Sequence, residues 1–189
     1  MDPRDSNLGF AILGLLRQAP RSGYDLRKAF TATPIAHFSD SPGAIYPALH
    51  RLHQRRWIAT LPAGRTGGRR RRVYAPTGLG RRVWRAWLRR PPTREEVVRD
   101  MDGLVLRFAF MSGALSNRES LLFLQQLRGG IDSYLAELRR FLAEHGPAMT
   151  LSGRLAFESG IESFAMYIRW AGGAIRHLRR EGARKRAPR

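Results

Sequence analysis

Residues 41–52 read SPGAIYPALHRL, and this pattern predicts a helix with one buried and one exposed face. Ser41 can cap the free backbone N–H groups at the helix start, and Pro42 stands where a missing N–H costs nothing. The apolar residues Ile45, Leu49 and Leu52 recur at helical spacing. They are therefore expected to form the buried stripe.

The opposite face of this helix has small side chains at its start and polar or basic ones further on: Gly43, Pro47, His50 and Arg51. Neighbouring helix positions differ by about 100°, so Tyr46 and Ile45 cannot face inward equally. We expect Tyr46 to face outward, the alternative being a core aromatic. Proline removes a backbone hydrogen bond, so Pro47 indicates that the helix begins only shortly before it.

An arginine-tipped hairpin is predicted to follow this helix. Residues 57–61 and 72–76 have the length and composition of strands, and the segment between them contains three glycines. That segment runs into four consecutive arginines, residues 69–72. The flat donor fork of arginine fits phosphate oxygens and can enter a narrow minor groove. The alternative is a solvated charge run, but the order helix, strand and basic hairpin favours a DNA-reading unit.

Three further helices are predicted in the first half of the chain. The first has an apolar face that begins at Leu8, and it ends near Pro20. The second starts at Ser22, which can pair with Asp25 as a helix cap, and it ends near Pro34. Thr77 is a plausible cap for a helix that buries two tryptophans and ends before two prolines, residues 91–92. We place a domain boundary at these prolines.

Three helices with seven-residue apolar seams are predicted in the second half. One opens at the Thr93 capping box and continues to Met111, and a second opens at the Ser116 capping box and ends at a glycine, Gly146. The third spans residues 157–178. Two seams can pack on each other, and the remaining apolar surface favours a second chain. The glycine pairs at residues 129–130 and 172–173 indicate either close backbone contact or a bend.

The composition favours a nucleic-acid partner. The net charge is +19, and most of it lies before residue 91 and in the last residues, whereas residues 91–175 are nearly neutral. A coding bias can explain why arginine is preferred to lysine, but not why acidic residues are scarce before residue 91. No apolar run reaches a membrane-spanning length, the N-terminus lacks the pattern of a signal peptide, and there is no cysteine. We therefore expect a cytoplasmic protein without membrane contact.

Catalysis, metals and cofactors are not expected. His50 and His53 have metal-ligand spacing on a helix, but no carboxylate or cysteine lies nearby to complete a site. The Ser39-Asp40-Ser41 run lacks the glycines of a nucleophile elbow, and the glycines of the hairpin lie between two strands rather than ahead of a helix. The sequence thus predicts a protein that is not an enzyme.

Four short motifs resemble the PadR family of bacterial transcription regulators: GLL at residues 14–16, SGYDL at 22–26, SPGAIYPALHRL at 41–52 and YAPTGLG at 74–80. The resemblance implies a winged helix-turn-helix, a homodimer joined through C-terminal helices, and repression that a small molecule or other signal releases. Two positions depart from the family pattern. Arg56 stands where a helix-ending glycine is usual, which implies either strain of about 1 kcal/mol or a different helix end. Pro76 replaces an aliphatic strand residue, so that strand should be an edge strand or already finished.

The expected fold is mainly α with a small two-stranded β-wing. Its domains are a DNA-binding domain over residues 1–90, a helical dimerisation domain over 93–181 and a basic tail over 182–189. The expected function is a dimeric regulator, most simply a repressor, that reads a near-palindromic operator; the alternative is a sequence-indifferent nucleic-acid-binding protein. The expected DNA-binding residues are Ser22, Tyr24, Ser41, Gly43, Ala44, Tyr46, Pro47, His50, Arg51, Arg69, Arg70, Arg71 and Arg72. A small-molecule effector is expected near Phe164, Tyr167 and Trp170, for which core packing is the alternative.

Overall fold

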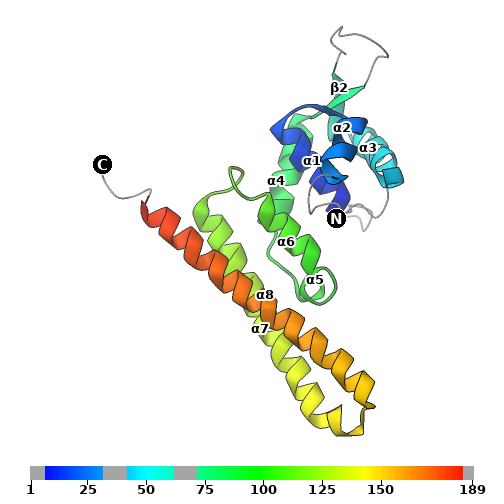
Figure 1. The fold of residues 1–189 in the computed structure, drawn as a ribbon. Helices are drawn as coiled ribbons and strands as arrows, with labels where there is room; N and C mark the ends of the chain where they lie inside the picture. Colours follow the sequence, from blue (N-terminus) through cyan, green and yellow to red (C-terminus); the bar gives the residue numbers. More distant parts are fainter. Residues whose placement is uncertain (1–6, 32–41, 62–71, 185–189) are drawn as a thin grey trace. The chain divides into compact units, whose positions relative to one another are not determined.

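A computed structural model describes residues 7–31, 42–61 and 72–184 (Figure 1). The chain divides into two compact units, residues 1–90 and residues 91–189. The described part is mainly helical with a small antiparallel sheet in the first unit, which confirms the predicted fold class. Among these residues, no helix combines the length and apolarity that crossing a membrane requires.

The first unit is a winged helix-turn-helix. Its elements are α1 (Asn7–Gln18), β1 (Arg21–Ser22), α2 (Gly23–Thr31), the 3-10 turn η2 (Pro42–Ala44), α3 (Ile45–Gln54), β2 (Ile58–Leu61), β3 (Val73–Pro76) and α4 (Gly78–Arg89). The antiparallel sheet has the order β1-β3-β2, with Arg21 opposite Tyr74 and Thr60 opposite Tyr74 on the other side. The sequence did not predict β1, because a two-residue strand has no periodicity and exists only through its pairing with β3.

The core of this unit is built around Phe10 on α1. Its ring stacks on Trp87 with centroids 4.6 Å apart, and its carbonyl oxygen accepts a 3.1 Å hydrogen bond from Trp84 Nε1. Both tryptophans come from α4 and are buried. An aromatic pair of this kind contributes roughly 1 kcal/mol beyond its buried area. These contacts hold α4 against α1, the first helix of the unit.

Pro76 ends β3 rather than marking an edge strand. It pairs with Ile58 on β2, whereas β1 reaches only Tyr74 and Val73 on the other side of β3. Proline has no N–H to donate to a neighbouring strand. Among the described residues, no residue of β1 lies opposite Pro76, so no carbonyl there is left without a donor. Neither alternative is confirmed, because β3 is the central strand of the sheet and still includes Pro76 as its last residue.

Arg56 adopts the left-handed conformation in which the family pattern has glycine. Its φ is 56°, and it is the one non-glycine residue with positive φ among those described. Its N–H donates to the carbonyl of His53 at 2.9 Å, and the N–H of Trp57 donates to that of Leu52 at 2.9 Å. These two bonds are the Schellman arrangement that ends a helix. Of the two alternatives predicted from the sequence, a strained Arg56 or a different helix end, the structure therefore has the first.

Replacing Arg56 with glycine should stabilise the first unit by about 1 kcal/mol, because glycine takes this conformation without a Cβ clash. The Arg56 side chain is exposed, so little packing is lost. Urea unfolding of the wild type and R56G, followed by tryptophan fluorescence, measures the difference. An exposed glycine substitution elsewhere on α3, at Gln54, should instead lower stability by a similar amount. Equal destabilisation by both changes would contradict the strain argument.

The second unit contains two short helices and a long helical hairpin. Its elements are α5 (Arg94–Arg99), α6 (Met101–Ala109), α7 (Asn117–His145), the 3-10 turn η3 (Gly146–Ala148) and α8 (Leu151–Arg184). The capping boxes at Thr93 and Ser116 are both formed as predicted. The apolar seams of α7 and α8 pack on each other, as in the Tyr134–Phe164 ring contact with centroids 4.9 Å apart.

One predicted feature of this unit is wrong. The single helix from Thr93 to Met111 is broken at Asp100, whose carboxylate accepts from the N–H of Gly103 at 3.1 Å and so caps a new helix. The apolar spacing continues across this break, which is why periodicity alone did not reveal it. The predicted end of the next helix is confirmed, because α7 ends at His145 with Gly146 as its C-cap, although the Gly146 φ of −55° is not left-handed. Its helical conformation instead continues into η3.

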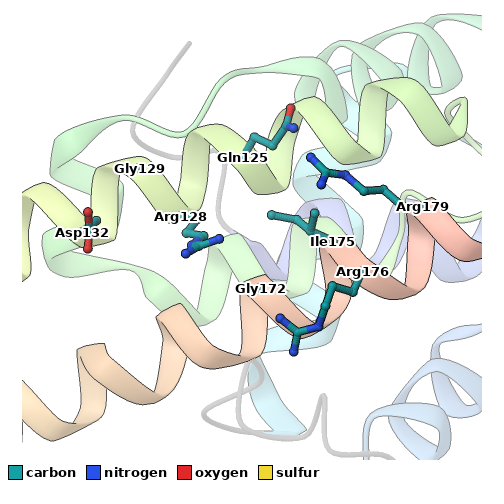
Figure 2. A pocket seen from close by; sticks show the side chains of 8 residues that line it. All are labelled: Gln125, Arg128, Gly129, Asp132, Gly172, Ile175, Arg176 and Arg179. Carbon is teal, nitrogen blue, oxygen red and sulfur yellow. The ribbon is translucent and has the colours of Figure 1, made fainter.

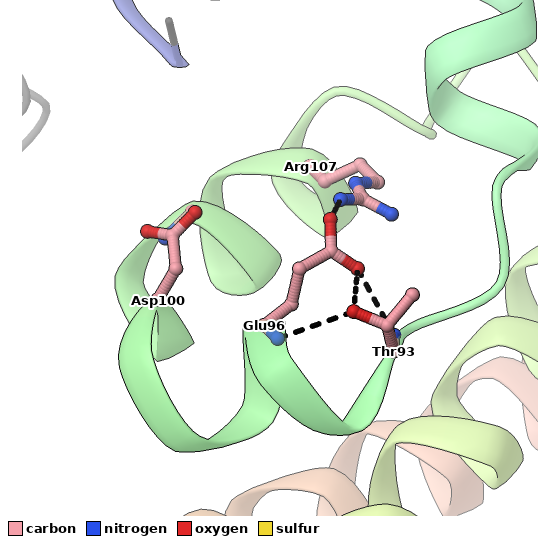
Figure 3. A network of polar contacts seen from close by, with 5 residues as sticks. Thr93, Glu96, Asp100 and Arg107 are labelled. Carbon is pink, nitrogen blue, oxygen red and sulfur yellow. Dashed lines mark hydrogen bonds and ion pairs between the residues drawn. The ribbon is translucent and has the colours of Figure 1, made fainter. Parts of the chain in front are cut away.

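A buried ion pair joins the two short helices (Figure 3). Arg107 Nη2 on α6 contacts Glu96 Oε1 on α5, and the Arg107 side chain is only 3% exposed. The other carboxylate oxygen of Glu96 accepts from the N–H of Thr93 at 3.0 Å, within the capping box. The Arg107 guanidinium also lies over the ring of Phe123 on α7, 5.8 Å from its centroid. One carboxylate thus links α5, its cap and α6.

Candidate nucleic-acid interface

Helix α3 has the two faces that its sequence predicts. Ile45, Leu49 and Leu52 are buried, whereas the Tyr46 side chain is 57% exposed. Gly43, Pro47, His50 and Arg51 are also exposed, and Ala44 is half-buried. The orientation of Tyr46 expected from the sequence is therefore confirmed, and the alternative of a core aromatic is wrong. An exposed helix face with small, aromatic and basic side chains has the form of a recognition surface.

Two hollows meet at Tyr46, between α3 and the base of the wing. One has a volume of about 400 Å³ and is lined by Ser22, Gly23, Tyr24, Tyr46, Arg72 and Tyr74. The other has a volume of about 250 Å³ and is lined by Tyr46, Leu49, His50, His53, Thr60, Arg72 and Tyr74. Tyr46, Arg72 and Tyr74 line both. Tertiary structure therefore brings the last wing arginine beside the exposed face of α3.

Gly23 allows Tyr46 to lie over the start of α2. A Cβ at position 23 would stand 2.7 Å from Cε1 of the Tyr46 ring, which is closer than a side chain can approach. The glycine of the SGYDL motif thus provides space for the tyrosine of the SPGAIYP motif. Both motifs are visible in the sequence, but the sequence does not show that they touch, because Gly23 and Tyr46 are 23 positions apart.

Ser22 does not belong to the exposed face. It is 4% exposed, its hydroxyl donates to Asp25 Oδ2 at 2.7 Å, and it accepts from the N–H of Asp25 at 3.2 Å. The Ser22 side chain therefore caps α2 and is already engaged within the protein. A role of Ser22 in DNA binding stays a prediction. Its neighbour Tyr24 is 48% exposed, with the Arg27 guanidinium 5.7 Å from its ring centroid.

Four of the expected DNA-binding residues, Ser41, Arg69, Arg70 and Arg71, lie outside the described residues. Arg72 is described and exposed. For the described residues, no group of three or more His, Asp or Glu side chains is arranged to hold a metal ion. His50 and His53 line the smaller hollow without a carboxylate.

The aromatic residues expected near an effector are half-buried and pack against their neighbours. Phe164 contacts Tyr134 edge-on, and Trp170 contacts Phe108 edge-on with centroids 5.7 Å apart. The Tyr167 hydroxyl donates to Asp102 Oδ1 at 3.3 Å. Burial raises the pKa of Tyr167, and the Asp102 carboxylate raises it further, so the hydroxyl keeps its proton. These are the contacts of a packed core, and the effector role stays a prediction.

Known proteins match this chain over the segment that contains these motifs. The profile of the "Transcriptional regulator PadR-like family" matches residues 12–86. The "Negative transcriptional regulator PadR" of Bacillus subtilis (strain 168) is 31% identical over 121 residues, a match that spans 64% of this chain and 65% of the relative.

Solved structures of similar proteins cover most of the chain. Bacillus subtilis PadR in complex with operator DNA is 24% identical and covers 90% of this chain and 98% of its own, with a TM-score of 0.43. The same protein in complex with p-coumaric acid is 23% identical, with coverages of 94% and 98% and a TM-score of 0.42. The assignment rests on the sequence match. Residues 12–86 thus belong to the PadR-like family of transcriptional regulators, and the chain spans less than two thirds of the length of the curated relative that it matches.

Proposed function

We propose that this chain is a dimeric DNA-binding repressor that reads a near-palindromic operator with α3 and grips flanking phosphates with its wing. The observation that carries the proposal is the exposed face of α3, where Tyr46 and His50 stand beside Arg72. The names of the relatives support it, since one is a negative transcriptional regulator and its structure contains operator DNA. By the same reasoning a small-molecule effector belongs to the proposal, since that relative was also solved with p-coumaric acid.

Apolar side chains on the second unit support a homodimer. Large apolar residues are strongly exposed on α7 and α8: Leu122, Phe141, Leu151, Leu155 and Met166. Exposed apolar surface of this kind marks association sites, and symmetric dimers are the commonest outcome. To read two successive major grooves, the two copies of α3 in the dimer would have to lie about 34 Å apart, which is one turn of DNA.

Sequence-specific binding separates this function from the alternative of sequence-indifferent binding. We expect the affinity for the DNA upstream of the chain's own gene to exceed that for random duplex by at least about 10³-fold at physiological salt. Fluorescence anisotropy with both duplexes measures this ratio. Y46A should reduce the ratio more than Y46F, because the ring lies on the reading face. A ratio near one in the wild type would leave only the sequence-indifferent alternative.

Wing contact should appear in the salt dependence of binding. If Arg72 covers one phosphate in each chain, R72A should lower the log–log salt slope of a dimer by about 1.8, since each lost contact removes about 0.9. Arg85 is a matched control, because it is an exposed arginine on α4 of the same unit and lines neither hollow. R85A should leave the slope unchanged. Equal slopes for R72A and the wild type would exclude Arg72 from the interface.

A further inference from the structure

A hollow of about 400 Å³ lies between α7 and α8, within the second unit (Figure 2). Arg128 comes from α7, and Arg176 and Arg179 come from α8; all three are exposed and line this hollow. Figure 2 shows Arg128 and Arg179 extending into the space between the two helices. We call these residues, with Gln125 and Asp132 on α7, the arginine pocket.

Two glycines create the space for the arginine pocket. A Cβ at Gly129 would meet nothing within 4 Å, so this position opens onto empty space, and Gly172 is buried in the facing wall. Both helices continue through these positions without a bend assigned to them. Each glycine costs its helix roughly 1 kcal/mol relative to alanine. Gly130, in contrast, lies against Val97 of α5, where a Cβ would be 3.3 Å from Cγ2.

Two guanidinium groups, one from each helix, lie near Gly172. Arg128 Nη1 and Arg176 Nη1 lie 3.9 Å and 3.6 Å from the same point, where a Cβ on Gly172 would stand. Within the part of the chain that the structure describes, no ion pair joins Asp132 or another carboxylate to these arginines. Positive charges that lie near one point repel each other, and an anion bound beside them would relieve the repulsion.

We propose that the arginine pocket binds a small phosphate-bearing molecule. Guanidinium groups present paired donors that match phosphate oxygens, and such charge-assisted bonds are about twice as strong as neutral ones. Arg128, Arg176 and Arg179 would hold the phosphate from two helices. Asp132 and Gln125 would contact hydroxyl or amine groups on the rest of the molecule. This binding does not depend on the proposed DNA function.

Calorimetric titration of the full chain with inorganic pyrophosphate tests the proposal, at an ionic strength held constant with sodium chloride. We expect saturable binding of one pyrophosphate per chain, with weaker binding of inorganic phosphate and of citrate. R128Q/R176Q should weaken pyrophosphate binding by on the order of tenfold or more. The matched control R139Q/R180Q removes two exposed arginines from the same two helices, outside the pocket, and should leave the affinity within about twofold.

A neutral variant separates shape from charge. G129L places a side chain in the open space without altering any arginine, so it should weaken pyrophosphate binding while leaving thermal unfolding at or above that of the wild type. Absence of saturable binding by the wild type, or equal losses in both double variants, would overturn the proposal. Tighter binding of citrate than of pyrophosphate would overturn the phosphate assignment. The phosphate assignment would also be overturned if R128Q/R176Q, but not the control variant, lost affinity for duplex DNA or no longer formed a dimer. Either result would assign the arginines to DNA or to a second chain.

Discussion

Replacing Gly80 with alanine should unfold the first unit or destabilise it by on the order of 4 kcal/mol, which is exceptional for a single methyl group. A Cβ at this position would stand 1.9 Å from the carbonyl oxygen of Trp57 and 2.8 Å from its carbon. Both atoms are backbone, so no side-chain rotation relieves the clash. Either α4 or the end of α3 must move.

The position of α4 is fixed from several directions. Thr77 donates from its N–H to the Trp57 carbonyl at 2.9 Å, and its hydroxyl accepts from the N–H of Gly80 at 3.0 Å. Displacing α4 would break this cap and separate Trp84 and Trp87 from Phe10. The clash therefore disrupts the cap and the core together, which is why we expect so large an effect.

Gly78 provides the matched control, two residues earlier on the same helix. A Cβ there would meet only Arg82 Nη1, at 3.7 Å, which is ordinary contact. G78A should therefore be neutral or stabilise by up to about 1 kcal/mol. Thermal and urea unfolding, followed by circular dichroism, compare the two variants. A G80A protein with the midpoint of the wild type would show that the close approach to Trp57 is not a requirement of the fold.

Breaking the buried ion pair of the second unit should cost about 3 kcal/mol. R107M keeps most of the apolar volume but leaves the carboxylate of Glu96, which is 18% exposed, without its guanidinium partner. Removing one member of a buried pair typically costs about 3–5 kcal/mol, and the partial exposure of Glu96 places the expectation at the lower end. Loss of contact with the Phe123 ring adds to the effect.

The exposed pair between Arg94 and Glu137 is the control, because it joins α5 to another helix of the same unit, α7, but its side chains are 69% and 46% exposed. R94M should cost less than about 1 kcal/mol. In a double-mutant cycle, E96Q/R107M should recover part of the loss of R107M, since no charge then remains buried. Similar losses for R94M and R107M, without recovery in the double variant, would mean that burial does not govern the energetics of these pairs.

Sequence reasoning succeeded where the signals are local. The caps at Thr77, Thr93 and Ser116 each require only residues within one helical turn, and all three are formed as predicted. The two faces of α3 follow from helical periodicity in the same way. The departure of Arg56 from the family pattern was also visible in the sequence, and its positive φ shows that the arginine takes the left-handed conformation of the missing glycine.

The same reasoning failed where distant segments meet. It named Ser22 as a DNA-binding candidate without showing that its side chain is buried, because a motif gives no burial for its members. It extended the helix from Thr93 through Asp100, because apolar spacing does not register a break that preserves the buried side. It did not decide whether the two glycine pairs allow close backbone contact or a bend. One of these glycines is in close contact with Val97, and two others open a hollow lined with arginine.

The sequence by itself determined the helix and strand order, the helix caps, the outward face of α3 and the family, since each depends on neighbours along the chain or on short motifs. Only tertiary structure decided that Tyr46 lies over Gly23 and beside Arg72, that Gly80 must lack a side chain, and that Arg107 is buried. The physical reason is that these properties are set by the close approach of atoms many residues apart. Packing decides which of the many possible approaches occurs, and local sequence does not encode it.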